Sequence, residues 1–263
     1  MEKRKYNKIG SQENEQSSEK ETIFGIRPVI EAIKAGKEIE KLLIQKDQHS
    51  LLINELVLLA YNHKIPVSKV PIEKLDSITR KNHQGVICFI SAITYSSLDN
   101  IISETYQKGL NPLILILDRI TDVRNFGAIA RTADCLGVHA IVVPSRGSAQ
   151  ITGDALKTSA GALSFIPVCR EDNLKNTITY LKENGLKIFG CTEKSDKNIF
   201  QCDFSGPAAV MMGSEEDGIS EEYLRKADET GKIPLSGNIA SLNVSVAAGM
   251  VLYEAVRQRS KVK

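Results

Sequence analysis

The second half of the sequence contains five polar side chains able to orient a substrate or to stabilise charge on it: Asn125, Arg131, Glu215, Ser241 and Asn243. Arg131 carries a permanent cation, which can stabilise developing negative charge and bind a phosphate. Asn125 lies six residues earlier, in the loop before the same expected helix, where its amide can orient Arg131 or a substrate. Such groups can position a nucleophile and stabilise the charge that forms on it.

Each of these side chains also has a purely structural explanation. Arg131, taken alone, is typical of a salt-bridging arginine on a helix surface. Glu215 lies between Gly213 and Gly218, in the turn after an expected buried strand, where an acidic residue suits the N-terminus of the next helix. Ser241 is well placed to cap the last helix. Gly213 is expected to let another group approach the backbone closely, since a side chain there would intrude.

Several common classes of site are absent from the sequence. The turn after residues 113–118 does not contain G-x-G-x-x-G, and the chain has neither a P-loop nor a G-x-S-x-G motif. The four histidines lack metal-ligand spacing, and the five cysteines form no C-x-x-C pair. We therefore expect no metal site and no disulfide framework.

Composition is that of an ordinary globular protein, with 42% hydrophobic and 25% charged residues. The formal net charge of +2 neither demands nor excludes a nucleic-acid partner. No apolar run approaches the ~20 residues of a membrane span, and the N-terminus lacks the apolar region of a signal peptide. We expect a cytoplasmic protein with no membrane partner.

The chain is expected to have four parts: a disordered polar leader (1–22), a small α/β domain (23–92), a linker (93–111) and a larger α/β domain (112–263). In the larger domain, strands are expected at 113–118, 140–143, 166–169, 187–191, 208–212 and 232–235, and helices at 126–136, 155–164, 174–184, 220–228 and 242–259. Continuous apolar strands that alternate with helices indicate a parallel sheet covered on both faces.

Three segments resemble the signature of the SpoU (TrmH) family of RNA ribose 2′-O-methyltransferases: residues 125–133, residues 212–218, and residues 233–235 with 241–247. Residues 23–92, with Phe24-Gly25-Ile26 near the start and His83-Gln84-Gly85 before the last strand, are similar to the L30e-like substrate-binding domain of the 23S ribosomal RNA guanosine-2′-O-methyltransferases. The resemblance covers nearly all of the chain except the leader and the linker.

The resemblance implies a SPOUT fold, in which a parallel-sheet domain with a C-terminal trefoil knot binds S-adenosyl-L-methionine and forms a homodimer. It implies that Arg131 activates the ribose hydroxyl, and that Glu215 and Asn243 belong to the active site. Gly213, Ile233, Leu242 and Thr192 are the expected cofactor-binding residues, and Ile233 and Leu242 are expected to hold the adenine.

The expected function is methylation of a guanosine ribose in 23S ribosomal RNA. Two alternatives stay open: a transfer-RNA 2′-O-methyltransferase of the same family, and a non-catalytic RNA-binding protein that kept the fold. Basic residues that favour contact with RNA phosphates are Arg27, Lys34, Lys37, Lys41, Arg80, Lys81, Arg124 and Arg146. Residues 82–84 (Asn-His-Gln) either contact RNA or form a polar turn before a strand.

Overall fold

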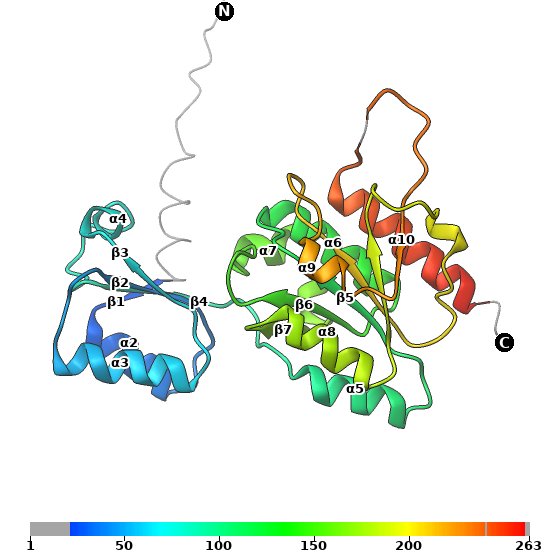
Figure 1. Ribbon diagram of the computed structural model, residues 1–263. Coiled ribbons are helices and arrows are strands. Elements are labelled where there is room, and N and C mark those ends of the chain that lie inside the picture. The colour runs from blue at the N-terminus through cyan, green and yellow to red at the C-terminus, as the bar shows by residue number, and fades with distance from the viewer. Residues whose placement is uncertain (1–21, 240, 261–263) are drawn as a thin grey trace, which may run out of the picture. The chain divides into compact units, whose positions relative to one another are not determined.

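The computed structural model describes residues 22–239 and 241–260, and the chain divides after Ala92 into two compact units. We call the described residues 22–92 unit 1 and the described residues 93–260 unit 2 (Figure 1). The expected leader lies outside the described residues except for Thr22, which begins the first strand.

Unit 1 is a mixed four-stranded sheet in the order β1-β4-β2-β3, with β2 and β3 parallel and the other neighbours antiparallel. Its elements are β1 (Thr22–Phe24), α2 (Ile26–Lys34), β2 (Ile39–Gln45), α3 (Leu51–Asn62), β3 (Val67–Val70), α4 (Ile72–Asp76) and β4 (Val86–Ile90). The amphipathic helices α2 and α3 bury Val29, Ile33 and Leu56 against one face of the sheet. The small α/β domain expected from the sequence is therefore present.

Unit 2 contains a six-stranded, wholly parallel sheet in the order β10-β8-β9-β5-β6-β7. The strands are β5 (Leu113–Leu117), β6 (Ala140–Pro144), β7 (Val168–Glu171), β8 (Lys187–Cys191), β9 (Ala208–Met212) and β10 (Glu229–Gly231). The helices are α5 (Leu98–Gln107), α6 (Val123–Cys135), α7 (Gly153–Thr158), α8 (Leu174–Glu183), α9 (Glu221–Leu224) and α10 (Val244–Arg259), with short 3-10 turns at Ala162–Ser164 and Ile199–Gln201.

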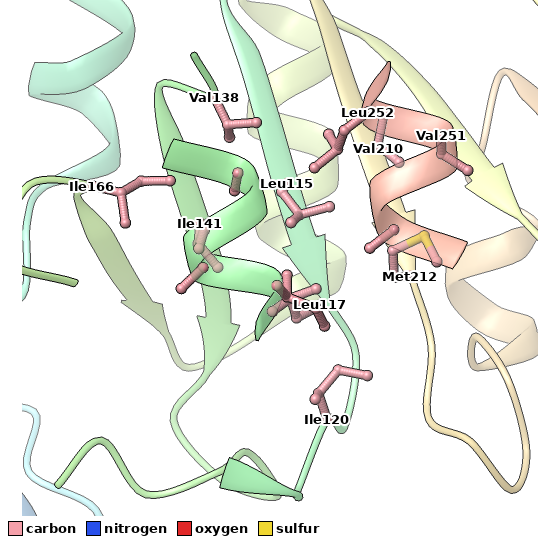
Figure 2. Packing of buried hydrophobic residues seen from close by; sticks show 14 of the residues in the cluster. Leu115, Leu117, Ile120, Val138, Ile141, Ile166, Val210, Met212, Val251 and Leu252 are labelled. Carbon is pink, nitrogen blue, oxygen red and sulfur yellow. The ribbon is translucent and has the colours of Figure 1, made fainter. Parts of the chain in front are cut away.

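Helices cover both faces of this sheet, as the apolar strands predict. Figure 2 shows Leu115, Val210 and Met212 from the strands gathered with Val251 and Leu252 from α10, and α6 packs into the same core. The alternate residues of the strands face α5 and α8 in a second core. Among the described residues, no helix is long and apolar enough to cross a bilayer.

The sixth strand differs from the sequence prediction. It occupies Glu229–Gly231, whereas 232–235 was expected, and of that expected segment only Lys232 forms a bridge, to Asn198. The strand lies at the sheet edge and is polar, so no apolar run marks it. Pro234 lacks the N–H that a strand within the sheet must donate.

The helices predicted at 155–164 and 220–228 are shorter than expected. The first ends at Thr158, and Gly161, with φ 86°, separates it from a 3-10 turn. The second spans only Glu221–Leu224. The stretch expected as a linker, 93–111, carries α5, whose Leu98 and Ile102 are buried in unit 2.

Arg259, the last residue of α10, links the end of that helix to the turns before β5 and β9. Its guanidinium donates to the carbonyls of Phe204, Asn111, Pro112 and Gly206 at 2.6–3.1 Å. Burial lowers the pKa of this guanidinium to about 10. Four backbone carbonyls from two distant turns therefore take the place of water around the buried guanidinium.

His139 makes the stability of unit 2 dependent on pH. Its Nδ1 accepts a hydrogen bond from the backbone N–H of Leu113 (3.0 Å), which requires the neutral ring. Burial and the nearby Arg259 cation hold the pKa of His139 below its ordinary value. Because the pKa of His139 is lower in the folded state, the neutral ring contributes to the free energy of unfolding. That contribution is fully present above the unfolded-state pKa of about 6.5, and it is lost as the pH falls through the folded-state pKa.

We therefore expect the free energy of unfolding of unit 2 to fall between pH 8 and pH 5, and to fall less in His139→Gln, whose amide oxygen can still accept from Leu113. Urea titrations followed by circular dichroism measure this, since the sequence has no tryptophan. The exposed His63 of unit 1 supplies the control, His63→Gln. An unchanged pH slope in His139→Gln would contradict the assignment.

Candidate active site

The loops that follow β5 and β9 meet at the end of the sheet where these parallel strands terminate. The two strands are parallel neighbours, with Leu117 paired with Met212, so their carboxyl ends lie together. The loop after β5 leads into α6, whose N-cap Asp122 accepts from the backbone N–H of Asn125 at 3.0 Å. The loop after β9 carries Glu215. Sheet order thus brings together residues 90 positions apart.

Three of the expected catalytic side chains form a hydrogen-bonded chain. The Asn125 amide Nδ2 donates to Glu215 Oε1, and Asn125 Oδ1 accepts from Asn243 Nδ2 at 3.0 Å. Asn243 is itself fixed, because its Oδ1 caps α10 by accepting from the backbone N–H of Ser245 at 2.9 Å. These contacts set the orientation of both amides. The carboxylate of Glu215 accepts its hydrogen bond from an uncharged amide.

Ser241 is not the cap of the last helix, although the sequence favoured that role as much as a site role. Asn243 caps the helix instead, because α10 begins at Val244. Both residue types are good N-caps, so the choice between them depends on where the helix starts. Ser241 is exposed and lines a cavity described below.

The loop that carries Glu215 is clamped by two residues that sequence reasoning did not single out. Asp118, only 3% exposed, accepts from the backbone N–H and the hydroxyl of Ser220 at 2.7 Å each. Arg119 donates to Asp217 Oδ2 (2.8 Å) and to the Gly218 carbonyl (3.1 Å). Arg119 has φ 59°, a left-handed conformation that costs ~1–3 kcal/mol and recurs at functional sites.

Gly213 is required by the loop that it begins, and its expected part in cofactor binding stays a prediction. A Cβ on this residue would overlap the backbone of Gly218 and Ile219, where the loop folds back on its own first residue. The absent side chain therefore makes room for the loop itself. A bulky residue at 213 would displace the whole loop, so Gly213→Val cannot isolate cofactor contact from loop structure.

Two cavities adjoin this loop. The larger, of about 610 Å³, is lined by all four expected cofactor-binding residues, Thr192, Gly213, Ile233 and Leu242, and by Ser241 and Glu215. The smaller, of about 270 Å³, is lined by Arg119, Asp122, Asn125 and Glu215. Residues 214–217 and Val244 border both, so this loop is the wall between the two cavities.

Acidic side chains dominate the polar lining of the larger cavity. Glu193, Glu215, Glu216 and Asp217 line it, against the single basic residue Lys194. A cavity lined in this way favours a ligand that carries positive charge. Among the described residues, no group of three or more His, Cys, Asp or Glu side chains is arranged to hold a metal ion.

Arg131 lies apart from the other expected catalytic residues. It is exposed on α6 and lines neither cavity. Six residues at 100° per residue place it about 120° around the helix from Asn125. Its guanidinium has no hydrogen-bond or ion-pair partner within residues 22–239 and 241–260. The side chain is thus available to a molecule outside the chain.

The chain matches the models of two known families. Residues 112–253 match the model of the SpoU rRNA Methylase family, which is more than half of the 263-residue chain. The chain belongs to the SpoU methylase family. Residues 22–96 match a second model, described as RNA 2′-O ribose methyltransferase substrate binding. The SpoU methylase described here is accordingly an RNA 2′-O-ribose methyltransferase, with its candidate site in the methylase part.

Relatives of this SpoU methylase match either nearly the whole chain or about three fifths of it. YacO of Bacillus subtilis, assigned to the TrmH family of tRNA/rRNA methyltransferases, is 35% identical over 246 residues, which cover 94% of this chain and 99% of YacO. The SpoU methyltransferase AviRb from Streptomyces viridochromogenes, solved in complex with the cofactor AdoMet, is 26% identical with a TM-score of 0.58, and the match covers 96% of each chain. The TrmH/SpoU tRNA modifying enzyme of A. aeolicus is 28% identical (TM-score 0.53) over 61% of this chain and 85% of that chain.

Proposed function

We propose that this methyltransferase uses S-adenosylmethionine to methylate the 2′-hydroxyl of a guanosine in 23S ribosomal RNA. The observation that carries the proposal is the fixed Glu215–Asn125–Asn243 chain beside the wall between two cavities. Ribosomal RNA is favoured over transfer RNA because the matching family model is described as an rRNA methylase family, and because the match to the tRNA modifying enzyme of A. aeolicus spans 61% of the chain.

The larger cavity fits S-adenosylmethionine in size and chemistry. Its volume of about 610 Å³ lies within the ~300–1,000 Å³ typical of small-molecule sites. Ile233, Leu235 and Leu242 offer apolar surface for an adenine, and the carboxylates suit a sulfonium and an ammonium group. When bound, the cofactor supplies an electrophilic methyl group.

The smaller cavity is the proposed acceptor site. Asn125 lines it and is held by Glu215 on one side and Asn243 on the other, so its amide can orient a ribose without further rearrangement. Arg119 and Asp118 are proposed to keep the wall in place, because they fix both ends of residues 217–220. A wall that shifts would misalign the two reactants.

Arg131 is proposed to stabilise negative charge on the ribose oxygen as its proton leaves, and to hold an RNA phosphate. A guanidinium is a poor proton acceptor, because it is a permanent cation in proteins. Because Arg131 lines neither cavity of its own chain, we propose that it reaches the acceptor only when RNA and a second protomer complete the site.

A homodimer is supported by an apolar stripe on α10. Val246, Met250 and Tyr253 recur at helical spacing and are 51%, 47% and 62% exposed. We expect a dimer in sedimentation velocity at micromolar concentration, and Met250→Glu should raise its dissociation constant at least tenfold by burying an unpaired charge. Leu110→Glu, at another exposed apolar residue, is the control. A wild-type monomer would contradict the dimer, and the knot expected beside it stays a prediction.

S-adenosylmethionine should bind without RNA and stabilise unit 2. At 100 times Kd a ligand adds ~2.7 kcal/mol, which corresponds to a rise in Tm of about 5–11 °C for a unit of this size. Leu242→Lys places bulk and a cation at the cavity lining, so calorimetry should show at least a tenfold loss of affinity. Leu110→Lys makes the same change outside the cavity. Equal affinity in the two variants would remove Leu242 from the cofactor site.

Mapping of 2′-O-methyl groups tests the proposed function. Ribosomal and transfer RNA would be compared from a deletion strain, a strain restored with the wild-type gene and one restored with Arg131→Ala. We expect one guanosine of 23S ribosomal RNA to lose its methyl group on deletion and to regain it only with the wild type. Loss from a transfer RNA would support the tRNA enzyme instead, and an unchanged map would support a non-catalytic binder.

A further inference from the structure

Unit 1 contains a cavity that the proposed catalytic steps do not use. It has a volume of about 410 Å³ and is bounded by three segments distant in sequence: residues 24–28, Leu52, and the pair Asn82 and Gln84. The volume lies near the lower end of the range for small-molecule sites, which suits a ligand about the size of one nucleoside. We call it the unit 1 cavity.

The lining of the unit 1 cavity combines apolar surface with amide and cationic groups. Phe24, Pro28 and Leu52 form apolar walls, and Arg27 is exposed beside them. The ammonium of Lys81 lies 5.7 Å from the centre of the Phe24 ring. Proteins recognise unpaired RNA bases by stacking on such rings, by hydrogen bonds from amides to the base edges, and by cations at the phosphates.

The turn that presents Asn82 and Gln84 is rigidly built. Gln84 and Gly85 have successive positive φ angles of 51° and 74°. The buried His83 braces this turn, with Nδ1 accepting from the Gly85 N–H at 3.0 Å and Nε2 within 2.9 Å of Asp76 Oδ1. Non-glycine residues held at positive φ cost ~1–3 kcal/mol and gather at ligand clamps.

Two further contacts fix Gln84. Gln48 Nε2 donates to the Gln84 carbonyl at 3.0 Å, and Gln84 Oε1 accepts from the N–H of Ile26, another lining residue, at 3.4 Å. Residues 82–84 therefore divide into a buried bracing histidine and two exposed amides at the cavity. His83 therefore has the turn role, whereas contact of Asn82 and Gln84 with RNA stays a prediction.

We propose that the unit 1 cavity binds one unpaired nucleotide of the RNA substrate. The base lies against Phe24 and Pro28, its edge meets the amides of Asn82 and Gln84, and Arg27 binds the adjoining phosphate. The proposal rests on the proposed function in taking RNA as the substrate, and it adds a specific requirement for a single-stranded nucleotide.

The experiment compares the full chain with Arg27→Ala/Asn82→Ala and with the matched control Asn62→Ala/Lys69→Ala. The control removes one amide and one cation from exposed positions of unit 1 outside the cavity. Fluorescence anisotropy measures binding to a single-stranded 20-nucleotide RNA of mixed sequence and to the same sequence as a duplex, without S-adenosylmethionine. Gln84→Gly, which removes an amide where φ already favours glycine, is a second variant.

We expect the cavity variant to bind the single strand about tenfold more weakly than the control and the duplex no more weakly than the control. Gln84→Gly should also weaken binding to the single strand, while cofactor affinity stays within twofold of the wild type. Equal losses in cavity and control variants, or equal losses for single strand and duplex, would overturn the nucleotide site. The readout is RNA binding and not methylation. Absence of methylation on any RNA would therefore contradict the proposed function without affecting the test of the nucleotide site.

Discussion

Replacing Arg131 with alanine should lower the single-turnover rate of RNA methylation by about 10²–10³-fold and leave cofactor affinity nearly unchanged. A preorganised donor that stabilises a developing oxyanion is typically worth this much. Arg131 is exposed and lines neither cavity, so its loss should disturb neither the fold nor the cofactor site. Rates with ribosomal RNA at saturating enzyme, and calorimetry with S-adenosylmethionine, measure the two effects separately.

Two further variants separate the charge of Arg131 from its shape and from the loss of any surface arginine. Arg131→Lys keeps the charge and loses the planar fork, so it should restore the rate only in part. Arg225→Ala removes another exposed arginine, at the end of α9, and should react at the wild-type rate. A wild-type rate for Arg131→Ala would make it an ordinary surface arginine, and full activity of Arg131→Lys would show that charge alone suffices.

Replacing Arg259 with alanine should destabilise unit 2 by about 3 kcal/mol and lower its Tm by roughly 6–12 °C. Hydrogen bonds from charged donors contribute ~1.5–3 kcal/mol each, and buried carbonyls left without donors add a cost that water relieves in part. Four carbonyls lose their donor at once. Thermal unfolding followed by circular dichroism measures the change.

Arg257→Ala is the matched control, since Arg257 lies one half-turn away and pairs only with Glu254 on its own helix. Pairs of this kind contribute ~0.3–0.5 kcal/mol, so its Tm should move by no more than about 2 °C. Arg259→Lys should fall between, because one ammonium cannot satisfy four acceptors. Equal shifts for Arg257→Ala and Arg259→Ala would show that the four bonds contribute little.

The sequence predicted those parts of the fold that an apolar pattern marks. The strands at Leu113–Leu117, Lys187–Cys191 and Ala208–Met212 were expected to within one residue, because each is a short buried run between turn signals. Strand β10 was misplaced because Glu229–Gly231 is polar and pairs only on one side. Strand β1 was missed because its three residues are only half-buried.

The candidate site was predictable in its residue types but not in its connections. The Asn125–Glu215 and Asn125–Asn243 contacts form because β5 lies beside β9. No local sequence pattern predicts that these two strands are neighbours. The clamp from Arg119 to Asp217, across 98 residues, was missed for the same reason. No local pattern in the sequence pointed to it.

The strand order also determines when unit 2 can fold during synthesis. β5 is the first strand of the sheet to leave the ribosome, yet its partner β9 begins at Ala208 and its anchor Arg259 comes later still. Until then one edge of β5 is unpaired in the nascent chain, and an unpaired apolar edge invites association with other chains. Unit 1, complete by Ala92, has no such dependence. During translation the substrate-binding unit is therefore complete well before the methylase unit, whose sheet cannot close until β9 has been synthesised.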